Sequence, residues 1–207
     1  RCYDPARDPE RHLTDSGRAL IAEMNRLGIL IDIMHLVEPA FWEVLDAIAG
    51  PALVSHGGVR GLTNSVRYLS DEQIRAVALT GGLVGASPTP LGPSLEQPGL
   101  PLLLDTVDYL VGLVGTSHVG IGVDYVEKYA EQETVVAPPS VVIWRTRRPD
   151  IFGPLSSFGR QTYPIGIETV TKLPNLTQGL FDRAYDREAT AAIMGGNWLR
   201  TFRKFCG

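Results

Sequence analysis

The segment GILIDIMH, residues 28–35, contains the pattern that decides the predicted fold. Gly28 ends a helical stretch that begins near Thr14, because glycine readily takes the left-handed conformation that closes a helix. The apolar run Ile29–Ile33 is typical of a strand buried on both faces, as in a parallel sheet. His35 follows it directly. This one segment therefore predicts a helix end, a strand and a candidate functional residue.

The same alternation continues along the chain. Three further strands are predicted over residues 52–54, 83–86 and 118–123. Helices are predicted over residues 38–49, 70–80, 102–114 and 186–205, the last with a weak point at Gly195-Gly196. Four parallel strands alternating with helices through short connections indicate βαβ units and an α/β fold class.

One stretch departs from this alternation. From residue 125 to about residue 171 the chain is rich in Pro, Gly and polar residues. A connection of this length without secondary structure is usually a lid, a binding loop or an insertion. The chain is therefore interpreted as one domain, residues 1–207, with an insertion over about 125–171.

Composition narrows the classes of function. The 207 residues have a net charge of −4 and a pI near 5.6, which argues against nucleic acid or a membrane surface as partner. No apolar run reaches the roughly 18 residues that a membrane span requires. Cys2 and Cys206 form neither metal-type spacing nor a disulfide framework. The sequence leaves the compartment open between cytoplasm, periplasm and secretion.

Polar residues stand at the ends of three predicted strands: His35, His56 and Asp124. Because active sites of parallel α/β folds lie at the carboxyl ends of strands, we expect these side chains to share one rim. Imidazole is a common zinc ligand, and a catalytic zinc keeps two or three protein ligands plus water. A lone histidine after a strand is more often a hydrogen-bonded loop residue. Two histidines with a carboxylate favour a metal centre.

Other polar residues are less informative by themselves. Arg67, in the loop after the second strand, could clamp a substrate carboxylate, but a surface arginine near a helix cap is the commoner case. His118 begins its strand, so it is expected at the opposite rim in a structural role. His12 is expected in a solvated loop.

Five segments in order resemble motifs of the renal (membrane) dipeptidase family, zinc-dependent peptidases of family M19. The first is Leu27–His35, similar to "LG-hydrophobic-hydrophobic-D-x-x-H". The second is Val54–His56 with Arg67 and Leu69–Ile74, similar to "SH…R-N-L-(S/T)-D-E-Q-I", and the third is His118–Asp124, similar to "HVGIGSD". The last two are Lys172–Thr177 and Gly195–Arg200, similar to "KLPNLT" and "GGNxLR".

The resemblance implies a (β/α)8 TIM-type barrel with two zinc ions at the carboxyl-end rim, of which this chain is the C-terminal half. It implies hydrolysis of the peptide bond of dipeptides by a metal-bound hydroxide. His35 and His56 match the two histidines that bind one zinc. Arg67 matches the arginine that holds the substrate's terminal carboxylate, and Asp124 the aspartate that helps to transfer the catalytic proton.

Two departures from the family pattern modify this expectation. The family's His-x-Asp ligand pair, bridging glutamate and substrate-contacting histidine precede the matched segments. We therefore expect the N-terminal half of the same barrel as a partner, without which the chain should be inactive; a homodimer is also compatible. After Asp124, Tyr125-Val126 replaces the family's Phe-Asp, and the insertion follows. Because an insertion on the catalytic rim can change substrate choice, a modified peptide is as plausible a substrate as a simple dipeptide.

Three rival interpretations remain. A non-catalytic barrel relative could serve as a binding or structural partner. Another amidohydrolase-type metal hydrolase could use the same barrel on lactones or phosphotriesters. A doubly wound nucleotide binder ranks last, because no G-x-G-x-x-G lies between a predicted strand and a helix.

Overall fold

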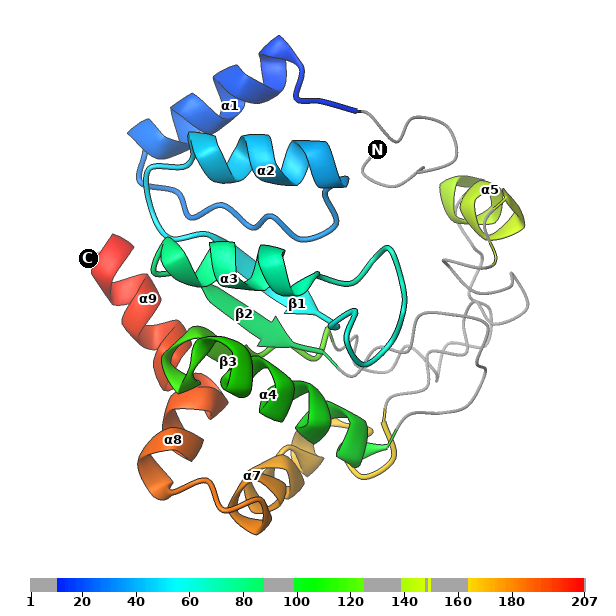
Figure 1. The fold of residues 1–207 in the computed structure, drawn as a ribbon, viewed down its shortest axis with the longest axis vertical. Helices are drawn as coiled ribbons and strands as arrows, with labels where there is room; N and C mark the ends of the chain where they lie inside the picture. Colours follow the sequence, from blue (N-terminus) through cyan, green and yellow to red (C-terminus); the bar gives the residue numbers. More distant parts are fainter. Residues whose placement is uncertain (1–10, 88–98, 125–138, 148, 150–163, 207) are drawn as a thin grey trace.

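A three-stranded parallel sheet forms the centre of the protein. The computed structural model describes residues 11–87, 99–124, 139–147, 149 and 164–206. The strands are β1 (Leu53–Gly57), β2 (Leu83–Ala86) and β3 (Val119–Ile121), in the order β1-β2-β3. Figure 1 shows helices α3 (Asp71–Leu79) and α4 (Leu100–Val114) lying across one face of this sheet. The predicted α/β class is confirmed.

Side-chain caps or an early proline mark where several of the predicted helices begin. Helix α1 spans Asp15–Arg26, and the Thr14 hydroxyl accepts a hydrogen bond from the Gly17 amide at 3.1 Å. Helix α2 spans Glu38–Ala47 and has proline in its first turn. Ser70 and Gln73 form a reciprocal capping box at the start of α3. Each cap satisfies amides that have no partner inside the helix, so local sequence decides these boundaries.

The first predicted strand, Ile29–Ile33, is reduced to a single bridge between Asp32 and Leu53. Two hydrogen bonds flank it, from Ile33 N to Leu53 O at 2.8 Å and from Leu53 N to Ile31 O at 3.1 Å. At the front of the run, Ile29 N closes helix α1 by bonding Met24 O at 2.9 Å. At its back, Met34 N turns toward Asp32 Oδ1. Backbone groups at both ends of the segment are therefore used in helix closure and in this turn, and only its middle pairs with β1.

The predicted helix over residues 186–205 is divided into three parts. They are α8 (Arg187–Ala191), a π-helical turn η5 (Ala192–Gly196) and α9 (Asn197–Cys206). The backbone of Gly195 leaves helical geometry, which agrees with the weak point expected at the glycine pair. Buried Asn197 anchors the start of α9 by donating to Thr116 O at 2.8 Å and Val119 O at 2.7 Å.

Two longer helices were not predicted. Helix α5 (Pro139–Arg147) lies within the stretch expected to be a loop, so that expectation is wrong there; residues 125–138, 148 and 150–163 of the insertion lie outside the described residues. Helix α7 (Pro174–Asp182) begins with a proline and buries Leu176 and Leu180. Short 3-10 turns, η1 (Thr116–His118) and η4 (Val170–Lys172), complete the described elements.

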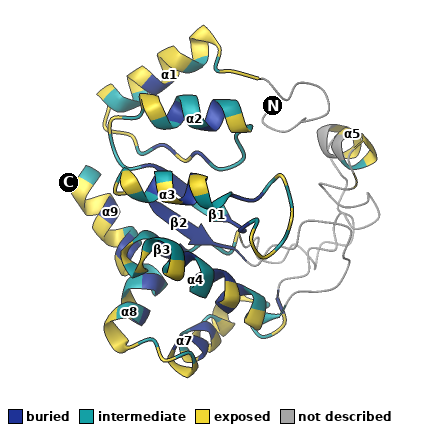
Figure 2. Cartoon of the chain, in the orientation of Figure 1, coloured by how far each residue is buried: buried dark blue, intermediate teal, exposed yellow. Residues whose placement is uncertain are grey.

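The core lies between the sheet and its helices. Every residue of β2 is buried, and Figure 2 shows this strand in dark blue with α3 and α4 in front of it. Leu103, Val107 and Leu110 of α4 are fully buried against it. No described helix is both long enough and apolar enough to cross a membrane. This packing holds β1 and β3 on either side of β2 and so fixes the carboxyl ends of both.

Candidate functional site

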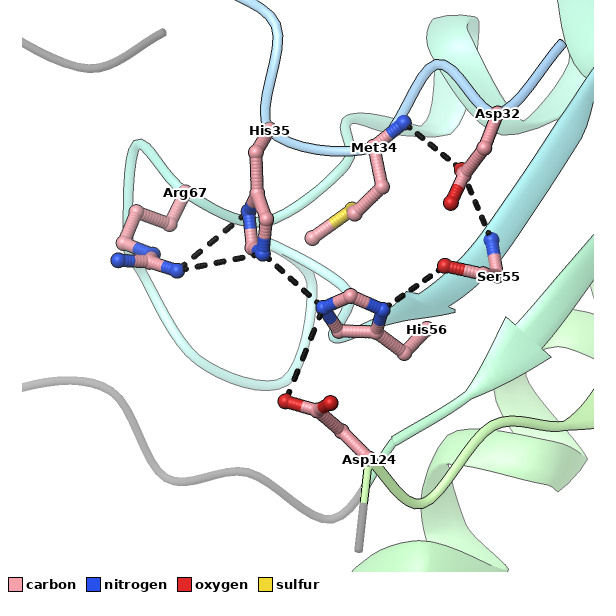
Figure 3. Close-up of polar contacts among 7 residues, drawn as sticks. All are labelled: Asp32, Met34, His35, Ser55, His56, Arg67 and Asp124. Carbon is pink, nitrogen blue, oxygen red and sulfur yellow. Dashed lines mark hydrogen bonds and ion pairs between the residues drawn. The ribbon is translucent and has the colours of Figure 1, made fainter. Parts of the chain in front are cut away.

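Four segments distant in sequence bring polar side chains to one end of the sheet (Figure 3). His35 follows the bridge at Asp32, and His56 lies in the last part of β1. Arg67 comes from the loop between β1 and α3, and Asp124 from just beyond β3. The structure therefore brings together the four residues that the sequence singled out.

The two imidazoles make the closest contact of the group. His35 Nε2 and His56 Nε2 lie 2.9 Å apart, with ring centroids separated by 4.8 Å and an interplanar angle of 70°. Two nitrogen lone pairs facing each other at this distance repel, so a proton or a cation between them is required. The pair therefore has the geometry of two donors directed at one point.

His56 is oriented through its other nitrogen. Its Nδ1 lies 2.9 Å from the hydroxyl oxygen of Ser55. When Nδ1 carries the proton and donates to that hydroxyl, Nε2 presents its lone pair toward His35. A hydrogen bond on the remote nitrogen is how metal-binding histidines are usually held in one tautomer.

The environment keeps His35 neutral at pH 7. Burial, the positive charge of Arg67 and the neighbouring His56 together lower the pKa of His35 to about 4, while Asp32 acts in the opposite direction. A neutral imidazole has a lone pair available at Nε2. His35 can therefore donate this lone pair to a cation at physiological pH.

Asp124 and Arg67 flank the histidine pair. Asp124 Oδ2 lies 4.0 Å from His56 Nε2, and the Asp124 side chain is 56% exposed. Arg67 Nη2 lies 3.4 Å from His35 Nδ1 and 3.5 Å from His35 Nε2. In Figure 3 the guanidinium and the carboxylate approach the pair from different sides. One basic and one acidic side chain thus flank the histidine pair.

Two of these residues have an uncommon backbone conformation. His35 has φ of 63° and Asp124 has φ of 51°, in the left-handed region that residues with a Cβ rarely adopt. Such a conformation costs on the order of 1 kcal/mol and clusters at functional sites. At both positions the chain leaves the sheet, so the turn directs the side chain across the strand ends.

Asp32 is a site residue that sequence analysis did not assign. Its Oδ1 accepts hydrogen bonds from Met34 N and Ser55 N, both at 3.1 Å. Each donor is the residue directly before a histidine of the pair. One oxygen therefore connects the two segments that carry the imidazoles. The available signal was a carboxylate within an otherwise apolar strand pattern, which needs polar partners.

The remaining two histidines lie outside the group. His118 Nδ1 is 2.9 Å from Gly82 O, in agreement with a structural role at the opposite end of β3. His12 is exposed, as expected, but its Nδ1 is held 2.5 Å from Glu43 Oε1. In the described part of the chain, no group of three or more His, Cys, Asp or Glu side chains is arranged to hold a metal ion. The facing pair of His35 and His56 is therefore smaller than such a group.

Known proteins resemble the chain over most of its length. Dipeptidase aclJ of Aspergillus oryzae is 27% identical over 205 residues, covering 96% of this chain and 41% of that protein. An amidohydrolase from Pseudomonas aeruginosa superposes with a TM-score of 0.74 at 28% identity, covering 94% of this chain and 58% of the other. A metallopeptidase from Rhodobacter sphaeroides, liganded with a phosphinate mimic of the dipeptide L-Ala-D-Ala, gives a TM-score of 0.70 at 26% identity, covering 95% of this chain and 49% of the other.

These coverages show that the chain spans 41% to 58% of the length of the three proteins. The sequence profile of one family, described as membrane dipeptidase (peptidase family M19), matches residues 2–142. That region includes His35, His56, Arg67 and Asp124. The family resemblance noted in the sequence is confirmed: the chain belongs to the membrane dipeptidase family, peptidase family M19.

Proposed function

We propose that the intact protein is a zinc-dependent dipeptidase in which His35 and His56 hold one metal ion. The observation that carries this proposal is the 2.9 Å approach of the two Nε2 atoms between a cation, Arg67, and an anion, Asp124. Membership of a dipeptidase family supports the reaction type, and the dipeptide mimic bound by the Rhodobacter sphaeroides relative supports the substrate class.

The donor pair fits zinc. Zinc–nitrogen bonds of about 2.0–2.1 Å would span nitrogens about 3.3 Å apart at the tetrahedral angle. The observed 2.9 Å is close to this separation, so small ring movements are sufficient. When bound, zinc would supply an activated water and polarise the substrate carbonyl. A two-donor site is incomplete as a catalytic zinc site, so further ligands must come from elsewhere in the intact protein.

The residues around the pair have distinct roles in this proposal. Arg67 binds the free carboxylate of the substrate, because a guanidinium can donate two parallel hydrogen bonds to it. Asp124 takes a proton during attack and passes it to the leaving amine; its exposure leaves it within reach of water and substrate. Asp32 holds the segments that carry the two histidines.

We further propose that residues 1–207 form the C-terminal half of a (β/α)8 barrel, completed by an N-terminal half with the remaining ligands. The parallel order β1-β2-β3, helices α3 and α4 across one face, and superposition on 58% of a larger amidohydrolase support this arrangement. The insertion over 125–171 would then border the catalytic rim and influence substrate choice.

Metal analysis of the intact protein together with a dipeptide hydrolysis screen tests the proposal. We expect bound zinc and hydrolysis that is lost on chelation and restored by zinc. A protein that binds no zinc and cleaves no dipeptide would instead favour the non-catalytic binding partner. Zinc binding with cleavage of lactones or phosphotriesters, but not of dipeptides, would favour another amidohydrolase-type reaction.

Arg67→Ala is expected to raise KM for dipeptides with a free carboxylate about tenfold to a hundredfold, because a hydrogen bond to a charged group contributes about 1.5–3 kcal/mol. KM for the corresponding dipeptide amides should change far less. Steady-state kinetics on matched acid and amide substrates measures the difference. Arg18→Ala, which removes an exposed arginine paired with Glu43, is the control. Equal effects on acids and amides would assign Arg67 a structural role.

Asp32→Ala is expected to weaken zinc binding about tenfold to a hundredfold, as the loss of a residue that orients metal ligands usually does. Competition titration with a chelating dye measures the affinity. Asp32→Asn keeps one carbonyl oxygen as acceptor and should recover part of the loss. Asp46→Ala, at an exposed position near the end of α2, is the matched control. Unchanged affinity in Asp32→Ala would contradict the positioning role.

A further inference from the structure

A cavity of about 190 Å³ lies beside His35 and Arg67. Its walls come from the segment 33–38, the first turns of α2 and the loop between β1 and α3. Ile33, Phe41 and Leu69 form an apolar interior and are 1%, 1% and 5% exposed. Val66, which is 49% exposed, lines the cavity near solvent. The cavity thus has a buried apolar interior and an accessible side.

Polar side chains that line the cavity already have hydrogen-bond or ion-pair partners within the protein. Arg60 Nε donates to Tyr68 O at 2.7 Å, and Arg60 Nη2 lies 3.5 Å from Glu38 Oε2. Gln73 is engaged in capping α3 through Ser70. These polar side chains therefore already have partners, and the surface offered to an incoming group is largely apolar. Such a site favours an apolar group over a charged one.

We propose that this cavity receives the side chain of the substrate's C-terminal residue and selects an apolar one. This inference rests on the proposed function, in which Arg67 binds the terminal carboxylate. That carboxylate is attached to the α-carbon of the C-terminal residue, so the side chain on the same carbon lies next to the guanidinium. Arg67 and His35 both line the cavity, so the cavity adjoins the carboxylate site and one histidine of the pair.

The size of the cavity agrees with one side chain. Sites for drug-sized ligands have volumes of about 300–1,000 Å³. The volume of about 190 Å³ is smaller than this, so the cavity is suited to part of a dipeptide and not to the whole molecule. The cavity therefore determines specificity at one residue, while Arg67 and the histidine pair contact the rest.

Two opposite substitutions at Val66 test the inference in the intact protein. Val66→Phe narrows the cavity, and we expect the ratio of kcat/KM for Ala-Leu over Ala-Gly to fall about tenfold or more, since one or two methylene groups in a pocket are worth that much. Val66→Ala widens it and should raise the ratio for Ala-Phe over Ala-Leu. Leu62→Phe, in the same loop at 42% exposure and outside the cavity lining, is the matched control and should leave these ratios unchanged.

The possible results separate the two proposals. If Val66→Phe and Val66→Ala change kcat/KM equally for all C-terminal residues, the cavity is not the side-chain site, although the dipeptidase function stands. If the substitutions instead change the ratio of kcat/KM for Leu-Ala over Gly-Ala, which differ in the N-terminal residue, the inference is overturned. If the unsubstituted intact protein cleaves no dipeptide, the proposed function fails and the inference fails with it. If the Val66→Phe protein does not fold, Val66→Ala by itself still tests the inference.

Discussion

His56→Ala in the intact protein is expected to remove about one zinc ion per chain and to lower kcat/KM about a thousandfold or more. A metal ion contributes several kcal/mol to transition-state stabilisation, and each 1.36 kcal/mol corresponds to a factor of ten. The substitution removes one of two Nε2 donors that lie 2.9 Å apart, so His35 alone would remain. Elemental analysis of the purified variant and steady-state kinetics measure both effects.

His118→Ala provides the control for this experiment. His118 bonds the Gly82 carbonyl at the opposite end of β3, so its removal should leave zinc content unchanged. A lower melting temperature is the expected consequence, because one carbonyl loses its partner. Full zinc occupancy in His56→Ala would refute the assignment of the pair as ligands.

Gly122→Ala is expected to reduce both stability and zinc affinity. A Cβ at this position would lie 2.0 Å from Ser55 O and 3.0 Å from His56 Cα, so the backbone of one segment must move. Overpacking of this kind typically costs about 1–3 kcal/mol. Gly122 lies close to Asp124 in sequence, and Ser55 directly precedes His56. The displacement therefore separates the carboxylate from the imidazole that it faces.

Thermal unfolding and zinc titration of Gly122→Ala measure these two losses. Gly112→Ala is the matched glycine control, since a Cβ there meets nothing within 4 Å and the residue lies within helix α4. Alanine in a helix interior is favoured by about 0.5–1 kcal/mol over glycine, so this control should be slightly stabilised. A Gly122→Ala protein with unchanged stability and zinc affinity would show that the close approach is not required.

The sequence predicted the part of the site that depends on periodicity. Apolar runs followed by polar residues were sufficient to place His35, His56 and Asp124 at one end of a parallel sheet. Arg67 was different, since its position in a loop carries no such information. Only its place in the family motif singled it out before the structure placed it beside His35.

Other features depend on contacts that no local pattern encodes. The strand expected at Ile29–Ile33 shortened to one bridge because helix closure and the turn at Asp32 compete for its ends. The close approach at Gly122 is to the Ser55 carbonyl, which is far away in sequence. Helix α7 was missed because its proline-containing start resembles a loop, while burial of Leu176 and Leu180 stabilises it.

The single bridge at Asp32 has a consequence for how metal binding and folding are related. His35 follows a segment joined to the sheet by a single bridge, whereas His56 lies in β1, which pairs with β2 on both sides of it, at Val54 and at Gly57. An ion shared by the two imidazoles would cross-link the weakly paired segment that carries His35 to strand β1, which carries His56. Its binding free energy would add to the stability of residues 31–35. Protection of those amides from hydrogen exchange would therefore rise with zinc occupancy. The same ion would then contribute both to catalysis and to the stability of the fold.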